Sequence, residues 1–425
     1  MYKPIDVIEV RIWNHKVGAL ALEPKSGFYA FEYDPKFIRS GIQLAPLEMP
    51  LAQDPYIFTY LPESTYNRLP ALLADALPDD FGNNLINAWM AANGIEKSDI
   101  TPLDRLAYMG ARGIGALEFK PARPLAKEKS TAIHLSQLVE SARQALRGTI
   151  GEDDPATAAL NQIIQIGTSA GGARAKAVVA WNPKTNELRS GQFDVSPGFE
   201  HWLLKFDGMG TDNALGIAKQ YGRIEYAYYL MARNAGITMS ECRLMQENNR
   251  AHFMTKRFDR NGNSKHHLQT LCALSHMDYK QTATHDYSQL FLTLTKLDLD
   301  YSAKEEAFRR MAFNYMAANC DDHTKNISFI LREHGTWELA PAYDITHAYN
   351  SKSPMNNQHL MAVNRKFKDV SREDLLKVAD QFGIGTAKRV LDQVHEAIIH
   401  WSNFAAQAEL NEVDIRRIAA HHNAM

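Results

Sequence analysis

One short segment of the sequence combines carboxylates, an imidazole, an ammonium and an amide: Asp321-Asp322-His323-Thr324-Lys325-Asn326. Asp321 and Asn326 have the spacing D-x-x-x-x-N. In phosphoryl transfer, such a loop places a carboxylate beside the attacking hydroxyl and an amide on a metal ion. Asp344 follows later, where a second metal-binding carboxylate would be needed. The pattern predicts a phosphotransferase site with Asp321 as the base, and spacing alone leaves Asp322 as an alternative.

The neighbouring segments predict how this loop is positioned. Upstream, apolar residues between Phe308 and Met316 recur at intervals of three and four, which predicts a buried helix that delivers the loop. Downstream, Ile327–Leu331 and Trp337–Leu339 have strand character and are joined by a glycine turn. Asp344 is therefore expected directly after a hairpin.

A second group of residues could hold the phosphates of a nucleotide. Gly167–Lys176 is rich in small residues, which let backbone N–H groups approach phosphate oxygens, although by itself it also fits a flexible loop. Lys205 lies inside an otherwise apolar predicted strand, where a buried ammonium favours a bound anion; the alternative is an edge-strand lysine in water. Glu225, on the next predicted helix, is either the partner of Lys205 or an exposed residue.

The composition is that of an ordinary globular protein with 425 residues, 45% of them hydrophobic and 23% charged. The formal net charge of −2 gives no global basic field for nucleic acid. The three cysteines form no C-x-x-C pair, which favours a reducing compartment. The sequence shows no apolar signal core and no apolar run long enough to span a bilayer. These features predict a cytoplasmic protein with no membrane contact.

The order of elements predicts an α+β fold. Alternation from Val7 to Phe31 predicts β-hairpins, and helical periodicity begins near Asn67. Further strands are expected at Ala177–Trp181, Trp202–Phe206, Cys242–Met245 and Ala251–Phe258, and helices at His134–Leu146, Ala156–Ile166 and Ile224–Ala235. Gly148–Pro155 is the candidate boundary between domains, and the chain beyond Gln269 is expected to be mostly helical.

Other candidate motifs are assigned no chemistry. The pairs His266-His267 and His421-His422 have no partners at metal-ligand spacing and are predicted to be surface residues. Gly110–Gly115 precedes a strand-like segment rather than a helix and is predicted to be a turn.

These motifs, taken together, resemble the HipA family of bacterial serine/threonine kinases over most of the chain. The resemblance rests on Leu77–Gly82, Pro102–Leu106 with Gly113–Leu117, Ser169–Lys176, Lys256–Arg260, Asp321–Asn326 and Tyr343–Ile345. It implies a protein-kinase-like bilobal fold with an N-terminal α/β subdomain (residues 1–152), a small β-rich lobe (153–262) and a large helical lobe (263–425).

The resemblance also implies a role for each matching residue. Asp321 would be the catalytic base, Asn326 and Asp344 would hold Mg²⁺, and Ser169 would be an autophosphorylation site. A phosphate on Ser169 adds about −1.5 to −2 charges and would repel ATP. The residues expected to bind ATP are Gly171, Gly172, Ala173, Arg174, Lys176, Lys205, Lys256, Phe258, His323, Lys325, Asn326, Tyr343 and Asp344. Lys256 departs from relatives that carry an acidic residue there.

Members of this family are typically toxins that phosphorylate a component of the translation machinery, often an aminoacyl-tRNA synthetase. Their partner is usually a small helix-turn-helix antitoxin, through which any contact with DNA would be indirect. Two alternatives stay open. One is a kinase for sugar-like small molecules, and the other is a kinase-shaped binding module that acts as co-repressor with an antitoxin.

Overall fold

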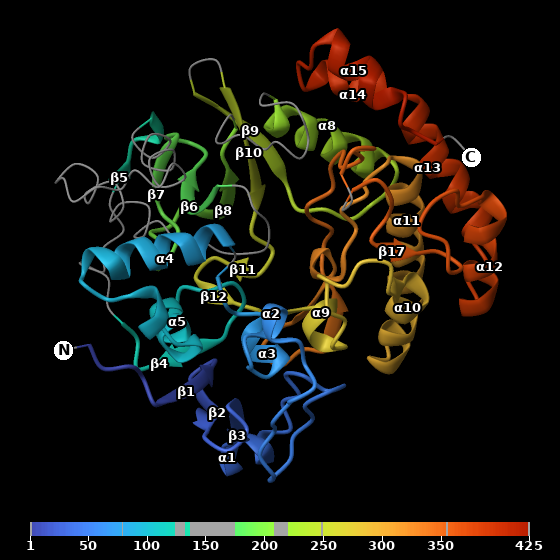
Figure 1. Cartoon of the computed structure of the whole chain (residues 1–425). Coiled ribbons are helices and arrows are strands. Elements are labelled where there is room, and N and C mark those ends of the chain that lie inside the picture. The colour runs from blue at the N-terminus through green and yellow to red at the C-terminus, as the bar shows by residue number, and fades with distance from the viewer. Residues whose placement is uncertain are drawn as a thin grey trace. The chain divides into compact units, whose positions relative to one another are not determined.

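The computed structural model describes residues 2–78, 80–123, 132–136, 175–207, 220–247, 250–353 and 356–423. The chain forms two compact units (Figure 1). The first unit comprises Met1–Gly210, Met254–Gln269 and Ile330–Thr336, and the second comprises Thr211–Phe253, Thr270–Phe329 and Trp337–Met425. This division does not test the three predicted segments, whose boundaries remain a prediction.

The first unit begins with a four-stranded sheet in the order β3-β2-β1-β4, and alternation of apolar residues explains it. Ile8, Val10 and Ile12 on β1 are fully buried and face the core together with Leu20 and Phe31. The predicted β-hairpins are therefore confirmed. The elements of this part are β1 (Val7–Ile12), β2 (His15–Glu23), β3 (Phe28–Tyr33), α1 (Pro35–Ser40), α2 (Glu63–Tyr66), α3 (Ala71–Ala74), α4 (Asp80–Ala92), η1 (Lys97–Asp99), α5 (Pro102–Met109) and β4 (Glu118–Lys120).

A six-stranded sheet follows in the order β5-β7-β6-β8-β10-β9. Its strands are β5 (Ala132–Ile133), β6 (Lys176–Asn182), β7 (Glu187–Ser190), β8 (Glu200–Lys205), β9 (Cys242–Glu247) and β10 (Arg250–Lys256). Because β8 lies between β6 and β10, the alternative that Lys205 belongs to an edge strand is wrong.

The segment Gly110–Gly115 is a turn, as predicted, and it is tied to a buried carboxylate. Gly110 and Gly115 have φ angles of 52° and 78°, which suit glycine. The Gly115 N–H donates to Asp259 Oδ2 at 2.8 Å. Asp259 is also paired with Arg257 at 2.7 Å and with Arg260 at 2.8 Å. This cluster connects the turn to the segment that follows β10 within the first unit, which also holds β11 (Arg260–Asn261) and β12 (Ser264–Lys265).

The second unit is mainly helical and is centred on α11 (Tyr301–Met316). From Ala307 to Met316 every residue of α11 is buried, which confirms the predicted helix. It packs against α10 (Tyr287–Lys296) and α13 (Ala387–Ile399), as Figure 1 shows. The other helices are α8 (Tyr221–Asn234), α9 (Leu271–Leu274), η2 (Thr324–Asn326), α12 (Arg372–Phe382), α14 (Trp401–Gln407) and α15 (Glu412–Ala419).

The remaining strands of the chain are short. They are β13 (His267–Thr270), β14 (His285–Asp286), β15 (Ser328–Leu331), β16 (Trp337–Leu339) and β17 (Met361–Ala362). β13, β15 and β16 form one sheet, and β14 pairs with β17 in parallel. The predicted strand pair after the Asp321 loop is present as β15 and β16. Among the described helices, each is too short or too polar to cross a lipid bilayer.

Several predictions fall outside the described residues. They are the boundary at Gly148–Pro155, the helix at Ala156–Ile166, the larger part of the helix at His134–Leu146, and the glycine-rich loop up to Arg174.

Two expectations about exposure are wrong, and one open alternative is excluded. His266 and His267 are buried, with 9% and 0% exposure, because both lie where the chain enters a sheet. His421 and His422 are half-buried. Glu225 is 3% exposed, so the alternative of an exposed helical glutamate does not hold. Its pairing with Lys205 stays a prediction.

The burial of His267 leads to a pH-dependent stability. Its Nε2 lies 3.1 Å from the Leu44 carbonyl oxygen, and burial lowers the pKa of His267 to about 4. An unfolded histidine has a pKa near ~6.5, so acidification protonates the unfolded chain first. Between pH 8 and pH 5, we expect His267 to reduce the free energy of unfolding by about 2 kcal/mol.

Urea denaturation of the wild-type protein and of His267→Leu at both pH values would measure this term. Other titrating groups cancel in the comparison, so the variant should lose less stability on acidification. An equal loss in the two proteins would show that His267 does not titrate as inferred.

Candidate active site

The loop predicted to carry the base belongs to the second unit and is held there by hydrogen bonds. The chain leaves α11 at Met316 and reaches Asp321 through a short turn. The Thr324 hydroxyl, fully buried, donates to the Met277 carbonyl oxygen at 2.6 Å. The Asn326 N–H donates to the His323 carbonyl oxygen at 2.9 Å, which closes the 3₁₀ turn η2. These backbone and side-chain bonds give the loop one defined shape.

The two neighbouring aspartates have opposite environments. The Asp321 side chain is 47% exposed, and its Oδ1 lies 3.7 Å from His323 Nε2. The Asp322 side chain is completely buried. A general base must come within hydrogen-bond reach of the substrate hydroxyl, and a carboxylate enclosed by protein on all sides cannot do so. The geometry therefore favours Asp321 as the base, the choice that the sequence left open.

Asp322 has a structural role instead. Its Oδ2 accepts hydrogen bonds from the Tyr287 hydroxyl at 3.0 Å and from His359 Nδ1 at 3.1 Å. Its Oδ1 accepts from the Leu360 N–H at 2.8 Å. Three donors satisfy the buried charge, as burial of a carboxylate requires. Asp322 thus clamps a segment that lies almost forty residues away onto the loop that carries Asp321.

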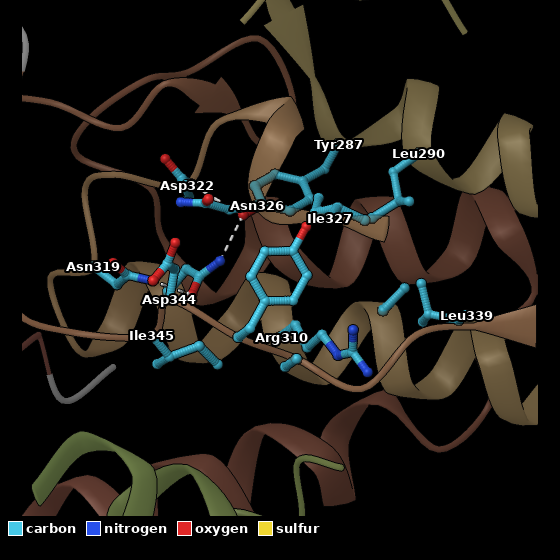
Figure 2. Close-up of a pocket in the computed structure, with 14 residues that line it drawn as sticks. Tyr287, Leu290, Arg310, Asn319, Asp322, Asn326, Ile327, Leu339, Asp344 and Ile345 are labelled. Atoms are coloured by element: carbon cyan, nitrogen blue, oxygen red, sulfur yellow. Dashed lines mark hydrogen bonds between the residues drawn. The ribbon is translucent and has the colours of Figure 1, made fainter. Parts of the chain in front are cut away.

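Asn326 and Asp344 line one cavity of about 30 Å³, as Figure 2 shows. Asn326 Nδ2 donates to the Asp321 carbonyl oxygen at 2.8 Å, which leaves its amide oxygen for a cation. The cavity is also lined by Asn319, whose buried Oδ1 has no hydrogen-bond partner among the described residues. In Figure 2 these polar groups gather at one end of the cavity, away from Leu290 and Leu339.

This set of donors fits a magnesium ion. Mg²⁺ prefers oxygen ligands and usually takes only one or two carboxylates, with water and phosphate completing its shell. The amides of Asn319 and Asn326 and the carboxylate of Asp344 supply such oxygens. The cavity has room for water molecules or an ion but not for a nucleotide. Within the described parts of the chain, no cluster of three or more His, Cys, Asp or Glu residues could hold a metal.

Aromatic side chains support the basic residues of the loop. Lys325 Nζ lies 5.0 Å from the centre of the Tyr279 ring, and the His323 ring is 5.2 Å from the same ring. The Tyr343 hydroxyl donates to the Lys325 carbonyl oxygen at 2.7 Å and also bonds to the Ser328 hydroxyl. Tyr343 is predicted to bind ATP. In the structure it supports the loop by bonding to the backbone of Lys325.

The first unit holds the predicted phosphate-binding lysines. Lys176 on β6 and Lys205 on β8 are directly opposite each other in the antiparallel register. Opposed residues of such a pair point to the same face of a sheet, and two like charges there are unfavourable. Lys176 is only 2% exposed. A phosphate group on this face of the sheet would be near both side chains.

The remaining predicted ATP ligands are only partly described. Lys256 Nζ donates to Glu200 Oε1 at 2.6 Å, so this side chain pairs across the sheet and leaves its backbone for other contacts. Phe258 is half-buried after the end of β10. Gly171, Gly172, Ala173 and Arg174, and the expected phosphorylation site Ser169, lie outside the described residues.

Comparison with known families decides what kind of protein carries this site. Residues 168–402 match the model of the HipA-like C-terminal domain, and residues 8–120 match that of the HipA N-terminal domain. This chain belongs to the HipA family. The resemblance inferred from the motifs is confirmed, and the two matches together extend over most of the sequence. A search among curated proteins found no match.

A solved HipA structure shows the fold. HipA of Shewanella oneidensis MR-1, determined in a complex with HipB and operator DNA, is 18% identical, with a TM-score of 0.65. The similarity covers 97% of this chain and 94% of that one. The predicted α+β, protein-kinase-like bilobal fold is therefore confirmed. The proinflammatory kinase CtkA of Helicobacter pylori is 14% identical over 59% of this chain and 93% of its own, and its TM-score of 0.35 carries no argument.

Sequence reasoning missed three contributors to this HipA-family site. Asn319 is two positions before Asp321, and an amide so close to the motif was a usable signal. Tyr279 and His359 lie some forty residues before and after the loop. Their spacing carried no signal, because only the tertiary fold brings these rings to the catalytic loop.

Proposed function

We propose that this chain is an ATP- and Mg²⁺-dependent serine/threonine protein kinase that acts as the toxin of a toxin–antitoxin pair. One observation carries the proposal: an exposed Asp321 belongs to the same loop as Asn326, which lines one cavity with Asp344, in a chain of the HipA family. This is the minimum set that a kinase needs to take a proton and to hold a metal nucleotide.

The proposed reaction assigns one task to each residue. The hydroxyl oxygen of the substrate attacks the γ-phosphorus of ATP, the bond to the β-phosphate oxygen breaks, and ADP leaves. The carboxylate of Asp321 accepts the hydroxyl proton. Asn326 and Asp344 would hold Mg²⁺, which when bound supplies neutralisation of the charge on the phosphates.

Basic residues would complete the binding of the nucleotide. Lys325 and His323 lie on the same loop as Asp321 and would contact the phosphoryl group being transferred. Lys176 and Lys205 are proposed to bind the phosphates of ATP, because they lie opposite each other on β6 and β8 and share one face of the sheet. The backbone around Lys256 and Phe258 would border the adenine.

The biological setting is also a proposal. Because the similar HipA of Shewanella oneidensis was solved with HipB and operator DNA, we infer that this chain binds a comparable antitoxin and meets DNA only through it. The substrate would be a protein of the translation machinery, such as an aminoacyl-tRNA synthetase. Phosphorylation of Ser169 on the glycine-rich loop would inactivate the enzyme, since added negative charge opposes ATP.

Incubation of the purified protein with ATP labelled at the γ-phosphate tests the activity. We expect label on the protein itself and on a protein of a cell extract, and no label when EDTA removes Mg²⁺. A panel of sugars and aminocyclitols should stay unlabelled. Rapid labelling of one of these small molecules would instead establish a small-molecule kinase.

A co-repressor without catalysis is the remaining alternative. Comparison of the phosphoproteome after expression of wild type and of Asp321→Asn would identify the substrate. If the two proteomes are identical while both proteins bind the antitoxin equally, the kinase proposal fails and the binding role stands.

A further inference from the structure

The loop that carries Asp344 is fastened on both sides of this residue. Before it, the Ala342 N–H donates to the Thr238 carbonyl oxygen at 2.8 Å. After it, the Ala348 N–H donates to the Ala318 carbonyl oxygen at 3.3 Å. Asp344 itself has a φ of 54°, in the left-handed region that residues other than glycine seldom adopt, although aspartate does so more often than most. Such a backbone persists only where its surroundings hold it.

The loop that carries Asp344 is also bonded to His421, through His347. His347 Nε2 and His421 Nδ1 are 2.9 Å apart, and the two rings are stacked with centroids 5.1 Å apart. Burial lowers the pKa of His347 to about 3, so this ring is neutral near neutral pH. The hydrogen bond therefore joins two uncharged rings, one as donor and one as acceptor.

His421 belongs to the segment His421–Asn423, and this segment also contacts the residues that precede the Asp321 loop. The Asn423 N–H donates to the Met316 carbonyl oxygen at 2.9 Å, at the end of α11. The Tyr228 hydroxyl donates to the Ala317 carbonyl oxygen at 2.6 Å and must therefore accept from His422 Nε2 at 3.0 Å. The segment is thus bonded to the two loops that hold the base and the metal ligand.

We propose that His421–Asn423 is a positioning element of the active site, which keeps Asp344 in its strained, metal-binding conformation. The inference rests on the proposed function, because it assigns Asp344 to the metal. Without the bond from His421, the loop keeps on this side the long bond from the Ala348 N–H at 3.3 Å. Asp344 could then relax to a negative φ, and its carboxylate would turn away from Asn326.

Binding of Mn²⁺, followed by electron paramagnetic resonance in the presence of a non-hydrolysable ATP analogue, tests this directly. We expect His421→Ala to weaken Mn²⁺ binding about tenfold, a loss typical of removing a group that orients a metal ligand. His400→Ala serves as the matched control. His400 is half exposed, and its ring bonds to Glu396, four residues earlier in the sequence. This control should bind Mn²⁺ like the wild type.

Each outcome decides between the claims. If wild type and Asp344→Ala bind Mn²⁺ equally or not at all, the proposed metal site fails. If wild type binds and Asp344→Ala does not, while His421→Ala binds normally, the positioning role is wrong. Should His421→Ala not fold, His421→Phe replaces it. Phe keeps the packing against Tyr349 but lacks the hydrogen bond, and the same loss is expected.

Discussion

Asp321→Asn is expected to reduce the rate of phosphoryl transfer by about 10³-fold while leaving the protein folded. The amide cannot accept the hydroxyl proton, and general-base catalysis commonly supplies ~10²–10⁴-fold. Stability should change little, because the Asp321 side chain is 47% exposed and its ion pair with His323 is long, at 3.7 Å. Single-turnover transfer from labelled ATP, together with the melting temperature, measures both quantities.

A matched substitution controls for loss of negative charge. Asp380→Asn changes an exposed aspartate on α12 and should retain wild-type transfer. Because the nucleotide would still bind, Asp321→Asn should keep its affinity for ATP. Transfer by Asp321→Asn at more than a tenth of the wild-type rate would remove Asp321 from the role of base.

Asp322→Ala, unlike Asp321→Asn, is expected to cause a large loss of stability. The substitution leaves the Tyr287 hydroxyl, His359 Nδ1 and the Leu360 N–H without their acceptor in a buried position. Each unsatisfied buried donor costs about 1–3 kcal/mol, so the free energy of unfolding should fall by about 3–5 kcal/mol. Urea denaturation monitored by circular dichroism measures this change.

Asp322→Asn provides the graded comparison. Its amide oxygen can still accept from one of the three donors, so its loss should be smaller than that of Asp322→Ala. A stability equal to wild type in Asp322→Ala would mean that the clamp between the catalytic loop and His359 contributes nothing. Together, the variants at 321 and 322 separate chemistry from structure at adjacent positions.

Much of the fold was predictable from local patterns. A period of two in Val7–Ile12 reports the face that the strand buries, and a period near 3.6 in Phe308–Met316 indicated a helix, which is buried on all sides. The D-x-x-x-x-N loop was also predictable, because its residues are close together in the sequence. Asp344 was predictable because it follows the expected strand pair. The glycine-rich loop around Ser169 lies outside the described residues, and its role remains a prediction.

Other features depended on contacts between distant residues. The exposure of His267 was misjudged because charge and polarity alone favour the surface, whereas a strand within a sheet buries it. Glu225 was open to two interpretations, and only its 3% exposure excludes one of them. The clamp of Asp322 by His359 joins positions 37 residues apart, and the bond from His421 to His347 joins positions 74 apart.

The sequence by itself determined the family, the alternation of strands and helices, and the residue types of the loops that are proposed to hold the base and the metal. These follow from hydrophobic period and from short spacing, which are properties of neighbouring residues. The tertiary structure alone decided which of the paired aspartates is reachable, which amides line the cavity with Asp344, and which residues His421–Asn423 contact. Burial and long-range hydrogen bonds set these properties, and both exist only once distant segments are packed together.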